Sequence, residues 1–432
     1  MIKSDPEKFW RQAHNIKIDI KNGKSFFETG YEYRIPYLPS KILYIYGIIF
    51  DEKFYEYKNK IYVDELADLD DKKEKKIKIN IDNKKFIFLL IQSFIYYISI
   101  FFLYSKIKKK FNEKYLFFLI GFLCFEPNII MFHSSFWSES IFLSLLIFSL
   151  VLIIDKNLTI KKSIFLGIIL GLLFLQRSVA IYYIFIVLIY FMTTLGLKDY
   201  KKITLIFVGY LIVLTFLGYH NFTRSSLFQI KPTQAMDGLY TYLIPNILAK
   251  KNNKSVGEIK DQLNFESNKW IKENNIDLRK ETNRLEFYKY LEKKSFDIIL
   301  NNFIETIKYT IKRTLHFLVF DPLRHVYYFY KYSLSEQDSF TKTDDHTKNI
   351  PLRIFYSLTI YLLAIIGFFV MLKKNKNNGL IFLLTLSIIY FISVSSWTGN
   401  NRYNVPNLIF MSFFIVEGFN YLFGKFFKKN DY

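Results

Sequence analysis

The chain has 432 residues, of which 51% are hydrophobic and 19% aromatic, and its formal net charge is +21. Long apolar runs in such a composition are typical of a polytopic membrane protein. They exclude a soluble protein, because most of these runs lack the polar face that a surface helix needs. No nucleic-acid-binding motif accompanies the positive charge, so we expect no nucleic-acid partner. The single cysteine, Cys124, excludes an internal disulfide and a cysteine-based metal site.

Residues 1–85 are the first predicted region, a polar outer segment with short juxtamembrane helices. Pro6–Asn22 is expected to be a helix, because proline suits a first helical position and apolar residues recur on one face. Ile42–Phe50 is apolar but too short to cross a bilayer, so it suits a helix at the membrane interface.

Nine apolar runs are the predicted membrane spans of this chain. Crossing the hydrocarbon core as a helix takes about 20 residues, with a usual range of roughly 17–25. Most runs meet this length, and the shortest would need a thinner bilayer or support from neighbouring helices. The runs are Phe86–Ser105, Tyr115–Met131, Phe136–Ile154, Ser163–Leu175, Ser178–Leu195, Ile203–Tyr219, Arg353–Leu372, Leu380–Ser396 and Asn404–Phe423.

The runs divide into a six-span block at residues 86–219 and a three-span block at residues 353–432. Residues 220–352, between the blocks, are predicted to form an extracytoplasmic loop domain that is helical. Within it, Ser255–Asn302 carries mixed charges at helical spacing, with an apolar set on one face. Ile304–Phe320 is amphipathic and basic, so we expect it to lie along the membrane interface.

Lysines occur in alternate short connections between the apolar runs, and this pattern predicts the orientation of the chain in the membrane. They follow the first, third, fifth, seventh and last runs, which places these connections and the C-terminus in the cytoplasm by the positive-inside rule. Residues 1–85 and 220–352 then face outward. Because no apolar signal peptide precedes so long an outer segment, we expect the natural protein to have a further N-terminal helix that this sequence lacks.

Polar residues at the outer ends of the runs are the candidate functional residues, because ionisable groups at membrane depth are costly and often functional. The first group holds Asp5 and, further on, Arg34. A helix cap explains Asp5 about as well as a functional site does. The second group holds Glu126, His133 and Glu139 around a short turn. Its structural alternative is a proline kink followed by a serine cap.

Two further groups add positive charge at the same predicted side. Arg177 lies between two apolar runs, where it can snorkel to the interface or bind an anionic head group. Asn400, Arg402 and Tyr403 lie at another helix junction, where an aromatic and basic membrane anchor is the alternative. We expect the four groups to form one outward-facing site. Its carboxylates suit a general base or a divalent cation, and its arginines suit phosphate.

Several of these segments resemble motifs of one enzyme superfamily. EPNIIMFHSSFWSES, from Glu126 to Ser140, and QRS at 176–178 resemble signatures of the GPI mannosyltransferases that use dolichol-phosphate-mannose. SDPEKFWRQA at 4–13 and RIPYLP at 34–39 resemble the first outer loop of the wider GT-C glycosyltransferases, which include bacterial aminoarabinose transferases and protein O-mannosyltransferases. NNRYNVP at 400–406 resembles the "RY..P" near their C-terminus.

The resemblance implies an all-α integral membrane enzyme that takes a sugar from a polyprenyl-phosphate carrier, with inversion, at the outer face of the plasma (inner) membrane. The acceptor would be a hydroxyl of a glycan, lipid or protein. It implies Asp5 as the general base and Glu139 as a second acid for substrate or metal. Arg177 and Arg402 would hold the lipid phosphate. The first membrane span of the family is missing from this sequence, and the resemblance does not identify which sugar is transferred.

Two other functions are alternatives to a glycosyltransferase. A flippase or transporter for lipid-linked glycans would carry charges near mid-span, whereas these lie at the outer rim. A polysaccharide polymerase also joins sugars from lipid carriers. Under the glycosyltransferase hypothesis, the residues expected to bind substrate are Arg34, Glu126, His133, Arg177, Asn400, Arg402 and Tyr403.

Overall fold

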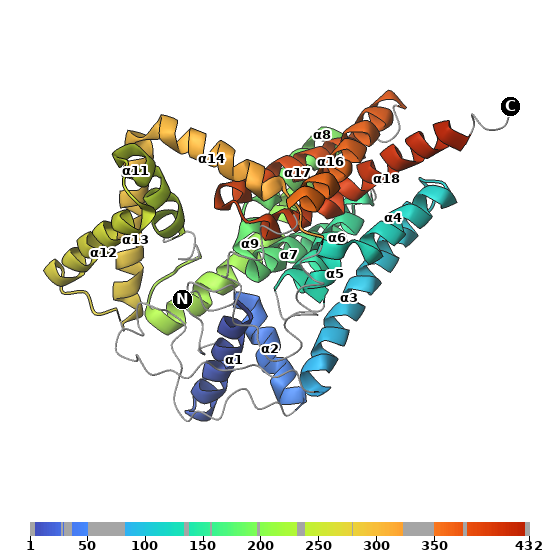
Figure 1. The fold of residues 1–432 in the computed structure, drawn as a ribbon. Coiled ribbons are helices and arrows are strands. Elements are labelled where there is room, and N and C mark those ends of the chain that lie inside the picture. Colours follow the sequence, from blue (N-terminus) through green and yellow to red (C-terminus); the bar gives the residue numbers. More distant parts are fainter. Residues whose placement is uncertain are drawn as a thin grey trace. The chain divides into compact units, whose positions relative to one another are not determined.

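The regular elements that the structure describes are all helices (Figure 1). The computed structural model describes residues 5–26, 29, 37–50, 83–133, 138–155, 158–196, 199–230, 238–278, 280–322, 350–374 and 378–427. The chain divides into two compact units. One holds residues 1–4, 78–213 and 316–432, and the other holds residues 5–77 and 214–315.

The first unit contains the apolar helices, and each predicted span overlaps at least one of them. They are α3 (Asn83–Ile107), α4 (Glu113–Phe125), α5 (Pro127–His133), α6 (Glu139–Ile154), α7 (Ile160–Gln176), η2 (Ser178–Ala180), α8 (Tyr183–Leu195), α9 (Tyr200–Ser225, whose last turns belong to the second unit), α16 (Ile350–Lys373), α17 (Asn378–Ser395), η6 (Ser396–Thr398), η7 (Asn401–Asn404) and α18 (Val405–Phe427). By length and composition, six of the described helices can cross a membrane, or up to seven if the bent pair α4–α5 is one span. The all-α class is therefore confirmed for the described residues, and six or seven of the nine predicted spans are helices able to cross a membrane, whereas α6 and α7 do not meet that length and composition.

The second unit contains the polar and amphipathic helices and one short apolar helix. They are α1 (Asp5–Lys21), α2 (Tyr37–Ile49), η4 (Leu239–Leu243), α11 (Ile244–Asn252), α12 (Val256–Glu273), α13 (Glu281–Asn301) and most of α14 (Phe303–Leu318). The predicted helix at 6–22 is confirmed to within a residue. Ser255 and Glu258 form a capping box that starts α12. Phe287 and Leu291 of α13 are buried in a shared core with α11 and α12, as their helical spacing predicted.

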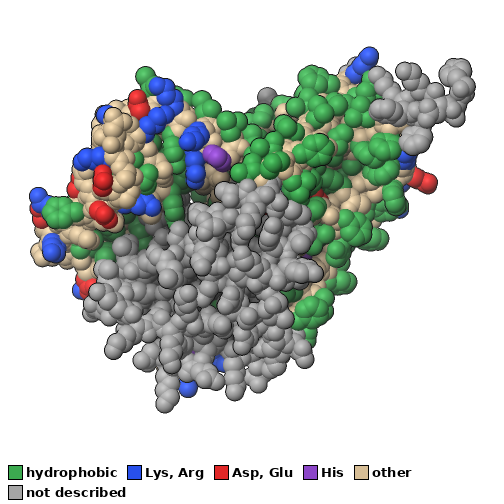
Figure 2. Space-filling view, in the orientation of Figure 1, with side chains coloured by type: hydrophobic (Ala, Val, Ile, Leu, Met, Phe, Trp, Pro, Cys, Tyr) green, Lys and Arg blue, Asp and Glu red, His purple; other side chains and the backbone are tan. Residues whose placement is uncertain are grey.

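The surfaces of these helices differ in polarity as the sequence predicted. Figure 2 shows that hydrophobic side chains dominate the visible surface over α16, α17 and α18, whereas charged side chains of both signs are frequent over α12 and α13. Among the exposed large hydrophobic side chains of α16 are Phe355, Leu358 and Leu362. A helix that exposes such residues in a folded protein needs an apolar surrounding, which a bilayer supplies.

Glycines allow two pairs of helices in the first unit to pack closely. α16 packs mainly against α18, where Gly367 faces the backbone at Phe414 and Gly418 faces the backbone at Leu363. Gly167 of α7 and Gly209 of α9 allow the same close approach between these two helices. A methyl group at any of these four positions would come closer than 3.0 Å to backbone atoms of the other helix. Such small residues let helix backbones approach in a membrane, where apolar side chains gain little from one another over lipid.

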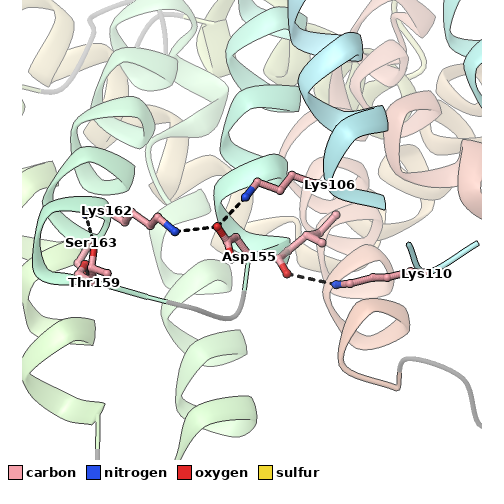
Figure 3. Close-up of polar contacts among 7 residues, drawn as sticks. Lys106, Lys110, Asp155, Thr159, Lys162 and Ser163 are labelled. Atoms are coloured by element: carbon pink, nitrogen blue, oxygen red, sulfur yellow. Dashed lines mark hydrogen bonds and ion pairs between the residues drawn. The ribbon is translucent and has the colours of Figure 1, made fainter. Parts of the chain in front are cut away.

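A lysine cluster joins the ends of three helices in this unit (Figure 3). Asp155, which follows α6, accepts hydrogen bonds from Lys106 of α3 and Lys162 of α7, both at 2.8 Å. Lys110 donates to the carbonyl of Ile154 at 3.3 Å. Burial opposes the charge of Asp155, but the two lysines outweigh it and lower the pKa of Asp155 from 3.8 to about 2.

Asp155→Asn should lower the free energy of unfolding at pH 7 by about 1 kcal/mol, because solvent screens lysines that are about two-fifths exposed. The pKa of Asp155 is depressed on folding, so its contribution is present above pH 3.8 and disappears as the pH falls toward 2. The destabilisation should therefore vanish in acid. SDS titration of the purified protein at several pH values measures it.

Asp199→Asn is the matched control, since Asp199 pairs only with Lys202 on its own helical turn among the described ion pairs. It should change the free energy of unfolding by less than about 0.5 kcal/mol. A destabilisation by Asp155→Asn that is as large in acid as at pH 7 would contradict the proposed role of the charge.

Candidate functional site

Glu139 is the centre of the candidate site and begins α6. Its residue is only 1% exposed. The residue before it, Ser138, was the predicted helix cap, but its side chain makes no capping hydrogen bond. Ser138 instead donates its hydroxyl hydrogen to Oε2 of Glu139 at 3.3 Å. The local sequence therefore helps to orient the carboxylate rather than closing the helix end.

Two arginines form ion pairs with the same oxygen of Glu139. Nη1 of Arg177 and Nε of Arg402 both contact Oε1. Arg402 lies 263 residues further along the chain than Glu139, so tertiary folding alone creates this pair. The arginine side chains are 11% and 7% exposed. The three charged groups thus share one nearly dry environment.

Local backbone structure sets the position of each arginine. α7 ends at Gln176, and Arg177 follows in an extended conformation before the short helix η2. The side-chain amide of Gln176 donates to the carbonyl of Ser138 at 2.9 Å, which ties the end of α7 to the start of α6. Oδ1 of Asn400 accepts the backbone N–H of Arg402 at 3.1 Å and caps η7. Asn400 therefore positions the segment that carries Arg402.

The Tyr403 ring lies beside both guanidinium groups. The Cζ of Arg177 is 4.9 Å from the ring centroid, and that of Arg402 is 5.6 Å from it. Aromatic faces attract cations at such distances, most strongly where water is excluded. Tyr403 thereby stabilises two like charges that would otherwise repel each other.

The described residues of this group carry charges of both signs. Glu139 supplies one carboxylate, and Arg177 and Arg402 supply two guanidinium groups. Guanidinium groups bind anions with several oxygens, such as a phosphate, through pairs of parallel N–H donors.

Glu126 belongs to a separate polar network at the bend between α4 and α5. The two helices meet at 50° around Pro127. Glu126 accepts hydrogen bonds from Asn128 at 2.6 Å and from Tyr356 of α16 at 2.7 Å. The backbone N–H of Ile129 donates to its other oxygen at 2.7 Å. These contacts support the structural interpretation of a kink, and none of them joins Glu126 to Glu139.

His133 lies at the end of α5, next to the Glu139 group. Its Nδ1 is 2.6 Å from the hydroxyl of Ser140, the residue after Glu139. Its ring packs on Tyr96 with centroids 4.0 Å apart, and Gln92 donates to its carbonyl at 3.0 Å. The buried Nε2 of His133 has no hydrogen-bond partner. His133 is thus linked to the site through Ser140.

The structure unites part of the predicted set. Glu139, Arg177, Arg402 and Tyr403 are in contact, with Asn400 and His133 beside them. Asp5 begins α1 in the second unit, and its side chain lies outside the described part, as does all of Arg34. The roles of these two residues stay predictions.

Sequence reasoning missed several residues that support the site. Gln92 donates to the carbonyl of His133, and Tyr356 donates to Glu126. Gln92 interrupts an otherwise apolar run, and this polar residue at membrane depth was a usable signal. Tyr356 carried no such signal, because tyrosine is common in membrane helices.

The sequence allowed a bound divalent cation at this site, but the described residues contain no set of ligands for one. No group of three or more His, Cys, Asp or Glu side chains that could hold a metal ion occurs within them. Glu139, the carboxylate that the structure describes at the site, is already paired with two arginines.

Comparisons with protein-family models, curated proteins and solved structures found no match to this chain.

Proposed function

We propose that this protein is a membrane glycosyltransferase of the GT-C type that uses a polyprenyl-phosphate sugar. The observation that carries the proposal is the convergence of Arg177 and Arg402 on Glu139, with the Tyr403 ring beside both guanidinium groups. The residues that meet come from three of the five segments whose motifs resemble that superfamily. Two buried guanidinium groups held in one place suit the phosphate of a lipid carrier.

The proposed reaction transfers the sugar in one displacement. The acceptor hydroxyl oxygen bonds to the anomeric carbon, and the bond from that carbon to the phosphate oxygen breaks. The hydroxyl proton goes to the carboxylate of Asp5, and polyprenyl phosphate leaves with the bonding electrons. Arg177 and Arg402 stabilise the charge that develops on the leaving phosphate, which is the step where fixed positive charge lowers the barrier most.

The two polar clusters of the first unit support an outward-facing site. α6 has Glu139 at its start and Asp155 directly after its end, and α7 has Lys162 near its start and Arg177 directly after its end. A helix of 16 residues is about 24 Å long, so the lysine cluster and the arginine site lie at opposite ends of this helix pair. If the lysines face the cytoplasm, the arginines face outward.

We propose that the chain crosses the membrane nine times, with α4–α5, α6 and α7 each counted as one crossing. α6 has 16 residues and α7 has 17, close to the lower limit for a span. The proposed membrane is the plasma (inner) membrane, with the C-terminus in the cytoplasm. The proposed partners are a polyprenyl-phosphate sugar donor, a glycan, lipid or protein acceptor, and the bilayer.

Asp5→Asn should lower the rate of sugar transfer by roughly 10²-fold or more, because the acceptor hydroxyl loses its base. Donor binding should not change, since the proposed phosphate ligands are Arg177 and Arg402. Purified protein in nanodiscs with radiolabelled polyprenyl-phosphate sugars measures both quantities. Glu7→Gln, which removes another carboxylate of the same helix, is the control and should keep the wild-type rate. Full activity of Asp5→Asn would remove the proposed base.

A further inference from the structure

Helix α14 presents an apolar stripe that the described residues leave uncovered. The stripe consists of Phe303, Ile307, Ile311 and Leu315, which recur every four residues, together with Ile304 beside them, and so lies on one face. Each of them is between 43% and 63% exposed. A folded protein rarely exposes five large hydrophobic side chains in a row unless they meet a partner or a membrane.

Cations flank this stripe on one side. Lys308 and Lys312 follow Ile304 at intervals of four residues, so they form the neighbouring column of the helix. Both are exposed. His316 continues this column, and Glu305 is the one acidic residue of the helix. Figure 2 shows hydrophobic and basic side chains next to each other over α14.

The end of α14 is held at the start of a membrane-spanning helix. Phe317 and Phe320 are fully buried, and the backbone N–H of Phe320 donates to the hydroxyl of Ser357 in α16 at 2.8 Å. The carboxylate of Asp321 pairs with Arg353, one helical turn before Ser357, at 3.5 Å. A charged pair at the beginning of a span is expected at the level of the lipid head groups. If α16 spans the membrane, the end of α14 is expected at the same level.

We infer that α14 lies in the membrane interface, with its apolar stripe in the acyl region and its lysine column on anionic lipid head groups. Amphipathic helices with lysines beside an apolar face bind membranes in this way. The lysine column would contribute to the preference for anionic over neutral lipid. This inference is independent of the proposed enzymatic activity, since it concerns only the bilayer.

The test uses full-length protein reconstituted in phosphatidylcholine nanodiscs, with Cys124→Ser removing the native thiol. Single cysteines replace Ile307 or Ile311 on the stripe and Glu305 or His316 on the polar side. A nitroxide label then reports collisions with oxygen, which enters the acyl region, and with a nickel complex, which stays in water. Labels on the stripe should favour oxygen over nickel by several-fold more than labels on the polar side.

A second measurement tests the lipid charge. Adding phosphatidylglycerol should lower the nickel accessibility at the Ile307 position by at least about twofold. Lys308→Gln with Lys312→Gln should abolish this response. Lys260→Gln with Lys269→Gln, which removes two exposed lysines from α12, should leave it unchanged.

Three outcomes would overturn the inference. Labels on the stripe that meet nickel as often as labels on the polar side would place the stripe in water. Shielding from both collision partners, together with spin coupling between labels, would show a second copy of the chain on the stripe. A response to phosphatidylglycerol that survives loss of Lys308 and Lys312 would remove the role of the lysine column.

Discussion

Glu139→Gln should lower the rate of sugar transfer by roughly 10²-fold or more, and it should lower the free energy of unfolding by about 3–5 kcal/mol. The loss of stability follows from burial. Without the carboxylate, Arg177 and Arg402 remain as two like charges in a site that is largely closed to water. The loss of activity follows if the carboxylate holds the guanidinium groups in the geometry that binds phosphate. SDS titration and the nanodisc transfer assay measure the two effects.

A double variant separates the structural role of Glu139 from its functional role. Glu139→Gln with Arg402→Gln removes one negative and one positive charge, so one buried arginine remains beside two neutral amides. We expect part of the lost stability to return, because the repulsion between the arginines is gone. We expect no return of activity, since a phosphate ligand is also gone. Full transfer by the double variant would show that the ion pair is purely structural.

Glu266→Gln is the matched control for stability. Glu266 pairs with Lys294 in the second unit, but its side chain is 38% exposed, compared with 1% for Glu139. An exposed ion pair contributes about 0.2–1 kcal/mol, so this variant should lose little stability and keep full transfer. An equal loss from both variants would contradict the role of burial at Glu139.

Gly367→Ala should lower the free energy of unfolding by about 1–3 kcal/mol, and Gly367→Leu should prevent folding. The reason is the close approach of α16 and α18, where a methyl group at Gly367 would meet the backbone at Phe414 and Gly418. Backbone atoms cannot move aside as a flexible side chain can, so the helices would have to separate. The measurement is SDS titration, with gel filtration in detergent to detect misfolded protein.

Gly121→Ala is the matched control, because no atom lies within 4 Å of the position that its methyl group would occupy. Gly121 is also in a helix, α4, so the two variants share the gain of up to about 1 kcal/mol that alanine has over glycine in a helix. Gly121→Ala should therefore be neutral or stabilising. If Gly367→Ala were equally harmless, the α16–α18 crossing would not depend on close backbone contact.

The same contact bears on the site. α18 follows η7, which carries Arg402, and Asn404 at the end of η7 donates to the hydroxyl of Tyr361 in α16 at 2.9 Å. Moving α18 away from α16 would shift the segment that presents Arg402 to Glu139. We therefore expect Gly367→Ala to lower sugar transfer more than Gly121→Ala does, although Gly367 is not part of the proposed site.

The amino-acid sequence by itself determined the membrane class and most helix positions. The length of an apolar run, the lysines after it, and caps such as Ser255 are local properties, so they can be interpreted without knowing which segments meet. The amphipathic character of α14 is local in the same way. The kink at Pro127 was also predictable, because proline lacks the N–H that continues a helix.

Only the tertiary structure decided which polar residues meet. Glu126 and Glu139 are close in sequence, yet Glu126 bonds to Tyr356 while Glu139 pairs with Arg177 and Arg402. A helix that is apolar on every side can face lipid with any of its sides. The periodicity of its sequence therefore does not show which side packs against another helix. The choice depends on close contacts such as that of Gly367 with α18, which join residues far apart in the chain.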